Sequence, residues 1–137
     1  MKISGNSICP CGSLKKYKNC CRIFHYGETP KTALQLMKSR YSAFVANNQD
    51  YIIKTTHRDN IDYTNDIQGW KNEINNFSKY SDFRKLEIIE FIDGEDIAYV
   101  TFKATIFQGA IDYSFVEKSK FLKEQGQWLY HSGEFIQ

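Results

Sequence analysis

The chain lacks the features that would place it in several familiar classes. No apolar run approaches the roughly 20 residues that cross a bilayer, and residues 1–6 contain no hydrophobic stretch of the kind that directs secretion. Internal repeats, low-complexity segments, a Ser/His/Asp pattern and a phosphate-cradling glycine loop are also absent. These absences argue against a membrane-spanning, secreted or nucleotide-binding protein, and they predict a cytoplasmic one.

Acidic residues are almost missing from the first 40 positions. Eight lysines and arginines stand there against the single acid Glu28, a formal charge of +7, which leaves −5 for residues 41–137 of a chain whose net charge is +2. The lysines and arginine nearest the cysteines are Lys15, Lys16, Lys18 and Arg22. A basic segment joined to an acidic body favours binding to an acidic protein surface or a nucleic-acid backbone. The alternative is that these side chains only solvate the segment and balance its thiolates.

Cysteine is absent outside one stretch, residues 9–21, where all four cysteines occur as C-x-C, eight further residues and C-C. Four thiols this close can surround one soft cation, and zinc is the usual occupant of a four-cysteine site. Pro10 and Gly12 allow the turn that points the first two cysteines at one place. Because protein fills all four positions, the sequence predicts one closed, structural Zn²⁺ site at Cys9, Cys11, Cys20 and Cys21.

Two other chemistries fit the same cysteines. A C-x-C or adjacent C-C pair can form reactive disulfides in a redox protein, and four thiolates can also hold an iron–sulfur cluster. A structural disulfide framework would need an oxidising compartment, which the lack of a secretory segment disfavours. We predict zinc, and a redox function and an iron–sulfur cluster remain the alternatives.

The spacing of apolar residues changes along the chain. It predicts a helix over residues 30–46, with Thr29 as N-cap, Pro30 at the first position and an apolar stripe of Leu34, Met37, Tyr41, Phe44 and Val45. A further helix is expected over 66–78. Alternation and turn signals then predict strands over 84–92, 96–107, 111–123 and 127–136. Helices followed by an antiparallel meander indicate an α+β fold.

Two motifs resemble those of a known family. The run C-P-C-G-S-L-K-K-Y-K-N-C-C resembles the SEC-C motif, the zinc knuckle that also ends the preprotein translocase ATPase SecA. The run L-M-K-S-R-Y-S-A-F, residues 36–44, resembles the start of the central domain of the bacterial YchJ family. Similar pieces follow at 69–70, 83–89, 117–121 and 127–130. The resemblance therefore covers nearly the whole chain.

This resemblance implies a fold and suggests a partner. It implies a SEC-C-like zinc knuckle over residues 1–24, and then a cone-shaped, nuclear-transport-factor-2-like domain over 30–137. That domain has three helices, one of them over 50–57, on a curved four-stranded sheet. The family has no established biochemical activity. The similar motif of SecA binds an acidic surface of the chaperone SecB and associates with ribosomes, which points to an acidic protein or ribosomal surface here. Such cones often pair through the outer sheet face, so a homodimer is possible.

Candidate chemistry within the cone is sparse. Glu117, flanked by aromatic residues on its strand, is the candidate general acid or base, although a rim carboxylate paired with a lysine is equally ordinary. His57 is a second candidate near the mouth of the cone, or simply a helix-end histidine. The expected pocket is lined by Tyr99, Tyr113, Glu117, Trp128 and Tyr130, which could instead be core. His25 is expected to pack on the knuckle and His131 to be exposed.

Two classes of function follow. The first is a non-enzymatic adaptor, in which the basic knuckle docks on a partner and the α+β domain is a scaffold. The second is a small lyase, isomerase or hydrolase, or a ligand-binding protein, that uses the aromatic cone with Glu117. A pocket of roughly 300 Å³ or more, in which Glu117 and a second polar group converge, would favour catalysis.

Overall fold

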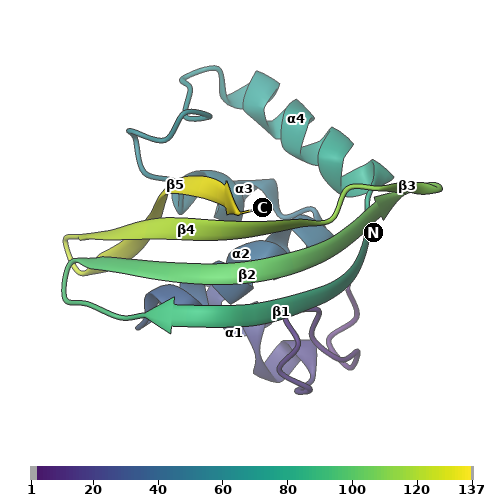
Figure 1. Cartoon of the computed structure of the whole chain (residues 1–137), viewed down its shortest axis with the longest axis horizontal. Coiled ribbons are helices and arrows are strands. Elements are labelled where there is room, and N and C mark those ends of the chain that lie inside the picture. The colour runs from purple at the N-terminus through teal and green to yellow at the C-terminus, as the bar shows by residue number, and fades with distance from the viewer. Residues whose placement is uncertain (1–2, 137) are drawn as a thin grey trace.

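A computed structural model, which describes residues 3–136, shows an α+β fold with its main helices on one face of an antiparallel sheet (Figure 1). The helical elements are η1 (Tyr17–Asn19), α1 (Cys21–His25), α2 (Ala33–Ala46), α3 (Gln49–Lys54) and α4 (Ile67–Tyr80). The strands are β1 (Asp82–Ile92), β2 (Ile97–Gln108), β3 (Ile111–Asp112), β4 (Phe115–Glu124) and β5 (Gln127–Ile136). The predicted fold class is confirmed. None of the helices between residues 3 and 136 is both long and apolar enough to cross a membrane.

The sheet runs in the order β1-β2-β4-β5, with the two-residue β3 also paired to β2. The hairpin turn at Gln125-Gly126 uses positive φ at both residues, and Gly109 turns the chain after β2 with φ +60°. The strand predicted over 111–123 is interrupted, because Ser114 leaves the ladder: its Oγ accepts a hydrogen bond from the Ile106 N–H and its own N–H donates to Asp112. Register shifts within the β1–β2 and β4–β5 pairs mark irregularities in the sheet.

Helix α2 begins three residues later than predicted. Its N-cap is Thr32, whose hydroxyl accepts from the Gln35 N–H at 3.1 Å, while the Gln35 side chain accepts from the Lys31 N–H at 2.7 Å. This T-x-x-Q arrangement resembles a capping box and replaces the expected start at Thr29-Pro30. The helix ends as predicted at Asn47, which adopts the left-handed conformation.

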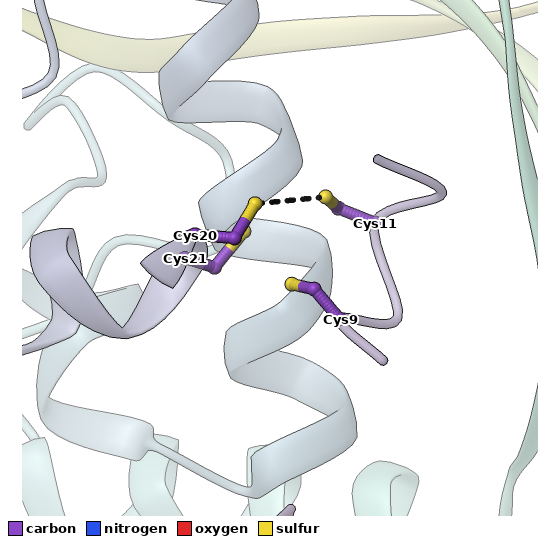
Figure 2. A group of neighbouring side chains, drawn as sticks. All are labelled: Cys9, Cys11, Cys20 and Cys21. Atoms are coloured by element: carbon purple, nitrogen blue, oxygen red, sulfur yellow. Dashed lines mark hydrogen bonds between the residues drawn. The ribbon is translucent and has the colours of Figure 1, made fainter. Parts of the chain in front are cut away.

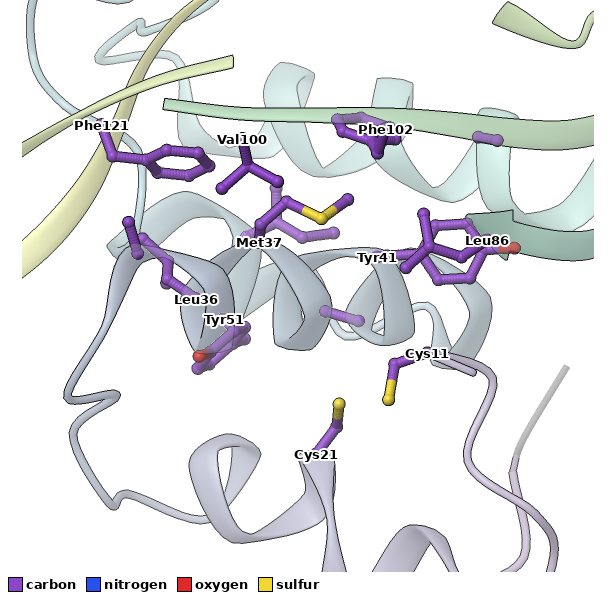
Figure 3. Close-up of a cluster of buried hydrophobic side chains, with 14 of the residues drawn as sticks. Cys11, Cys21, Leu36, Met37, Tyr41, Tyr51, Leu86, Val100, Phe102 and Phe121 are labelled. Carbon is purple, nitrogen blue, oxygen red and sulfur yellow. The ribbon is translucent and has the colours of Figure 1, made fainter. Parts of the chain in front are cut away.

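Helix α2 is covered on nearly every side, which the predicted apolar stripe did not indicate. Leu36, Ser39 and Ser42 are fully buried although none of them belongs to that stripe. Figure 3 shows why: the cysteine sulfurs lie on one side of α2, and Val100, Phe102 and Phe121 of the sheet lie on the other. The N-terminal segment, residues 3–25, and the sheet are therefore two layers that share one central helix.

Candidate metal centre and inner cavity

The four cysteines are brought together by a small hairpin and the start of α1 (Figure 2). Ile8 and Lys16 form an antiparallel bridge, and the Cys9 N–H donates to the Lys15 carbonyl at 2.8 Å. This places Cys9 and Cys11 on the turn of the hairpin. The 3₁₀ turn η1 then reverses the chain, so that Cys20 and Cys21 face them from the start of α1.

The sulfur atoms of Cys9, Cys11, Cys20 and Cys21 all lie within 4.8 Å of one another, and those of Cys11 and Cys20 are 3.6 Å apart. Hydroxyl groups approach two of the sulfurs: Ser42 lies 3.5 Å from Cys9, and Ser13 lies 3.1 Å from Cys20. Hydroxyl donors to sulfur stabilise thiolates, the form that binds a metal. The donor set and its spacing therefore fit one metal ion.

The thiols of Cys9, Cys11 and Cys21 are close enough to shift one another's pKa values. Hydrogen bonds from Cys11 and then Cys21 lower the pKa of Cys9 far below its ordinary value. The pKa of Cys21 is raised, first by its hydrogen bond to Cys11, then by that to Cys9, and then by burial. The cluster by itself thus favours ionisation of one thiol over another, whereas a bound dication would stabilise four thiolates together.

The N-terminal segment is attached to the rest of the fold at three points. Ser42 on α2 reaches Cys9, and the loop at Gly12 approaches β1 so closely that a Cβ there would lie 3.3 Å from the Leu86 carbonyl oxygen. His25 accepts from the Tyr17 hydroxyl at 2.6 Å and donates from Nε2 to the Ser39 carbonyl at 2.8 Å. The sequence predicted that His25 packs on the knuckle; the structure shows that it also joins the knuckle to α2.

Replacing His25 by phenylalanine should lower the free energy of unfolding by about 2 kcal/mol, because the ring is kept while two buried hydrogen-bonding groups, the Ser39 carbonyl and the Tyr17 hydroxyl, lose their partner. Urea unfolding monitored by circular dichroism measures this. Tyr113→Phe, at a half-exposed aromatic residue, is the control and should change stability by less than about 0.5 kcal/mol. Equal stability of the two variants would show that His25 is not a structural link.

The basic side chains of the segment lie outside the cysteine cluster. Lys15, Lys16 and Lys18 are exposed, and none of them has a carboxylate oxygen within 4 Å among residues 3–136. Arg22 is half-buried, with its guanidinium 4.8 Å from the centre of the Tyr26 ring. These three exposed lysines, which lie within four residues of the sequence and have no carboxylate partner among residues 3–136, are called the lysine patch below.

A cavity of about 230 Å³ opens between α2, α4 and the inner face of the sheet, and it contains Glu117. The Glu117 Oε2 accepts hydrogen bonds from Ser119 and, at 2.9 Å, from the Tyr130 hydroxyl. Burial raises the pKa of Tyr130, so the phenol stays protonated and donates. Gly133 on β5 faces this group closely: a Cβ there would lie 2.3 Å from Glu117 Oε2.

The structure brings only two of the five predicted pocket residues to the inner cavity. Glu117 and Tyr130 line the cavity, but Tyr99 lies on the other face of β2, with its ring 5.0 Å from the Lys118 ammonium. Tyr113 is half-exposed at the strand interruption, and Trp128 is buried in the core, 4% exposed, without lining the cavity. Strand alternation explains Tyr99, since its neighbours Val100 and Ala98 point inward.

The candidate His57 does not line the cavity. It is buried, its Nδ1 accepts from the Asp59 N–H, and its Nε2 donates to Glu124 at 2.7 Å. His131, expected to be exposed, is half-buried, with its ring 5.2 Å from that of His57. His57, Asp59 and His131 could meet at a metal, but both ring nitrogens of His57 are already engaged. This cluster therefore links the loop after α3 to β5.

Sequence reasoning missed Arg40, which lines the cavity and is only 9% exposed. It was counted only as one of the basic residues of the first 40. It lies one turn beyond Leu36 and so on the same face of α2, but that this face is covered is known only from the structure.

Comparisons with known proteins agree with this architecture. Residues 6–22 match the model of the SEC-C motif, and residues 32–133 match that of the YchJ middle NTF2-like domain. A UPF0225 protein of Vibrio parahaemolyticus is 37% identical over 94% of this chain and 75% of its own length. The UPF0225 protein YchJ of Shigella dysenteriae is 34% identical over 93% of this chain and 83% of its own.

Solved structures show the same two parts. A SEC-C motif-containing protein from Rhodopseudomonas palustris has a TM-score of 0.82 at 28% identity, and the match covers 96% of this chain and all of that one. One from Psychrobacter arcticus has a TM-score of 0.75 at 26% identity, covering 97% and 85%. With a cysteine cluster, a cone-like α+β domain and these relatives in agreement, the chain belongs to the YchJ (UPF0225) family, a SEC-C motif followed by an NTF2-like domain.

Proposed function

We propose that this protein is a zinc-stabilised interaction protein, in which the lysine patch docks on an acidic surface of a partner protein. The observation that carries the proposal is the exposed lysine patch without counterions, held on a metal-type cysteine cluster that is itself packed against the domain. A fixed positive surface of this kind attracts an acidic partner and sets its orientation.

The choice of zinc rests on ligand type and spacing. A tetrahedral Zn²⁺ with Zn–S bonds of about 2.3 Å holds its sulfurs about 3.8 Å apart. The Cys11–Cys20 separation of 3.6 Å is close to that value, and all four sulfurs lie within 4.8 Å of one another. Four protein ligands leave no open position, which supports a structural rather than a catalytic ion.

The charge of the metal site leaves most of the basic side chains uncompensated within the segment. A dication with four thiolates carries about −2, whereas the first 40 residues carry +7 without it. About five positive charges therefore remain within residues 1–40, although Arg40 is among them and is buried at the inner cavity, whereas residues 41–137 carry −5. This asymmetry supports a role for the N-terminal segment in docking.

Catalysis is the less supported use of the cone. The cavity of about 230 Å³ is smaller than the roughly 300 Å³ typical of substrate pockets, and Glu117 Oε2 already accepts two hydrogen bonds from the protein. Pairing of two copies through the outer sheet face stays a prediction.

Replacing Lys15, Lys16 and Lys18 together by alanine should weaken partner binding at least tenfold while metal content and unfolding temperature stay unchanged. Exposed charges act through a field that salt screens within about 8 Å, so binding by the wild type should also fall steeply between 50 and 300 mM salt, and the variant's salt dependence should be shallower. Affinity capture from nuclease-treated lysate, followed by titration with the purified captured protein, measures the partner affinity and its salt dependence.

The matched control is Lys79→Ala, Lys103→Ala and Lys123→Ala together, which removes the same charge from exposed positions of the NTF2-like domain. This control should keep its partner. Loss of binding in both triple variants would show a net-charge effect and overturn the assignment of the surface. Capture that disappears on nuclease treatment would replace the acidic protein by ribosomal RNA as the partner.

A further inference from the structure

Among residues 3–136, Arg40 is a buried cation without an ion-pair partner, and it lines the inner cavity. From this we infer that the cavity binds a small, singly charged carboxylic acid with an apolar body, and that the Arg40 guanidinium receives its carboxylate. This site is separate from the lysine patch, so the inference stands whether or not that patch docks on a partner.

One edge of the guanidinium is fixed by the protein. Arg40 Nη1 donates to the Ile52 carbonyl at 2.9 Å, to Thr55 Oγ1 at 2.8 Å and to Thr56 Oγ1 at 3.0 Å. Its plane also lies over the Tyr130 ring, with the guanidinium carbon 4.7 Å from the ring centre. These contacts tie α2 to the end of α3, and they hold the side chain in one orientation.

The other edge is free. Within residues 3–136, Arg40 Nη2 and Nε have no protein acceptor, and no carboxylate oxygen lies within 4 Å of the side chain. In the same part of the chain, no fully enclosed side-chain nitrogen or oxygen lacks a partner. These donors therefore keep accessible surface, and Arg40 lines both the cavity of about 230 Å³ and a second one of about 170 Å³ that shares several of its lining residues.

The group is a cation at neutral pH. Burial lowers the pKa of Arg40, but only to about 10, because Tyr130, Tyr51, Glu117 and Asp62 favour the charged form. Two parallel N–H groups on a planar cation match the two oxygens of a carboxylate. A charge held in this way, with two donors unused, is what an anion-binding cavity requires.

The other walls decide which anion fits. Glu117 and Asp62 line the same cavity and already offset the Arg40 charge, so a dianion such as a phosphate monoester would meet more like charge than a single carboxylate does. The remaining lining is mostly aromatic, and it includes the edge-to-face pair Phe44–Phe77 at 5.7 Å and the pair Phe102–Phe115 at 6.0 Å. A cavity of about 150 Å³ lined by apolar residues holds benzene, so about 230 Å³ accommodates a ring and a short acid.

The test is a titration of the full chain with phenylacetate, followed by two-dimensional NMR of the backbone and of the arginine Nε–H groups. We expect saturable shifts, largest at the Arg40 Nε–H, with a dissociation constant on the order of 1 mM or tighter for a ligand of this size. Phenylacetamide, the neutral isostere, and phenyl phosphate should each bind at least tenfold more weakly.

Two variants separate recognition from structure. Arg40→Lys keeps a cation but loses the planar fork, and should reduce the ratio of acid to amide affinity at least fivefold. Ala104→Leu fills the cavity from β2 without touching Arg40's contacts, and should weaken phenylacetate at least tenfold. Lys103→Leu, on the other face of the same strand, is its matched control and should bind as the wild type does.

Several outcomes would overturn the inference. They are the absence of saturable shifts up to 20 mM, equal affinity for acid and amide, or tighter binding of phenyl phosphate than of phenylacetate. Unchanged phenylacetate affinity in a folded Ala104→Leu protein would also overturn it, because the ligand would then lie elsewhere.

Discussion

Replacing Cys21 by serine should remove the metal from the protein and lower the free energy of unfolding by about 5 kcal/mol. Structural zinc contributes roughly 10–16 kcal/mol to small zinc domains that have no other core, and the NTF2-like domain keeps its own core. For a chain of this size the loss corresponds to a fall in melting temperature of about 15 °C. Metal analysis of protein purified in metal-depleted buffer, together with calorimetry, measures both effects; the wild type should carry about one zinc per chain.

The effect should extend beyond the N-terminal segment. Cys9, Cys11 and Cys21 are each 2% exposed and belong to the same buried cluster as Leu36 and the sheet residues. Unfolding the segment would expose Ser39 and Ser42, which are fully buried. Hydrogen exchange at the amides of α2 should therefore accelerate in Cys21→Ser, whereas a segment that unfolds alone would leave α2 protected.

Ser42→Ala is the matched control for this experiment. It removes the hydroxyl next to Cys9 but keeps all four sulfurs, so metal content should be unchanged and the loss of stability should be about 1 kcal/mol. Cobalt substitution gives an independent readout, since a tetrahedral site of four thiolates absorbs strongly in the visible range. Wild-type protein that holds no metal, or a disulfide in freshly reduced protein, would contradict the zinc proposal.

The cysteine cluster could be predicted from the sequence because its four members are close in the chain. Four cysteines within thirteen residues leave few arrangements, and Pro10 and Gly12 restrict them further. The helices and strands were also accessible, since periodicity is a local property. In this stretch the local sequence therefore determines both the ligand type and the turn that brings the ligands together.

The inner cavity could not be predicted to the same degree because its walls come from distant segments. Arg40 and Glu117 are 77 positions apart and meet only through the packing of α2 on the sheet. Local patterns grouped Glu117 with Tyr99 and Tyr113 in one pocket, and only Glu117 of the three lines the cavity, because these patterns do not reveal which face, or which end, of the sheet is covered. An arginine in a helix is ordinarily a surface residue, so its burial depends on covering elements that the local sequence does not encode.

Gly133 illustrates the same limit at one position. An isolated glycine in a strand indicates a bulge or a close approach in general, but the sequence does not reveal what approaches it; Gly133 pairs with Ser119 across β4 and β5 and lies against the Glu117 carboxylate. That pairing depends on the register shift between Lys120 and Phe121. A single additional residue in one strand decides which side chains meet, and local sequence patterns do not reveal it.

Replacing Gly133 by alanine should therefore destabilise the protein by about 3 kcal/mol, although alanine in a strand is ordinarily the more stable choice by about 0.5–1 kcal/mol. The new Cβ would lie 2.3 Å from Glu117 Oε2 and 2.5 Å from the Tyr130 hydroxyl. Relief requires Glu117 to move away from Ser119 and Tyr130, which leaves polar groups in the cavity without partners. Urea unfolding measures the difference.

A double-mutant cycle identifies the cause of this loss. In a Glu117→Ala, Tyr130→Phe background the atoms nearest the new Cβ are gone, so adding Gly133→Ala should cost less than about 1 kcal/mol. The difference of about 2 kcal/mol between the cost of Gly133→Ala in the wild type and its cost in this background would measure the contact itself. If the contact is real, Gly133→Ala should neither cost the same stability in both backgrounds nor stabilise the wild type. Either result would show that β5 does not press against Glu117. The side chains that face Arg40 across the cavity would then be held by other contacts.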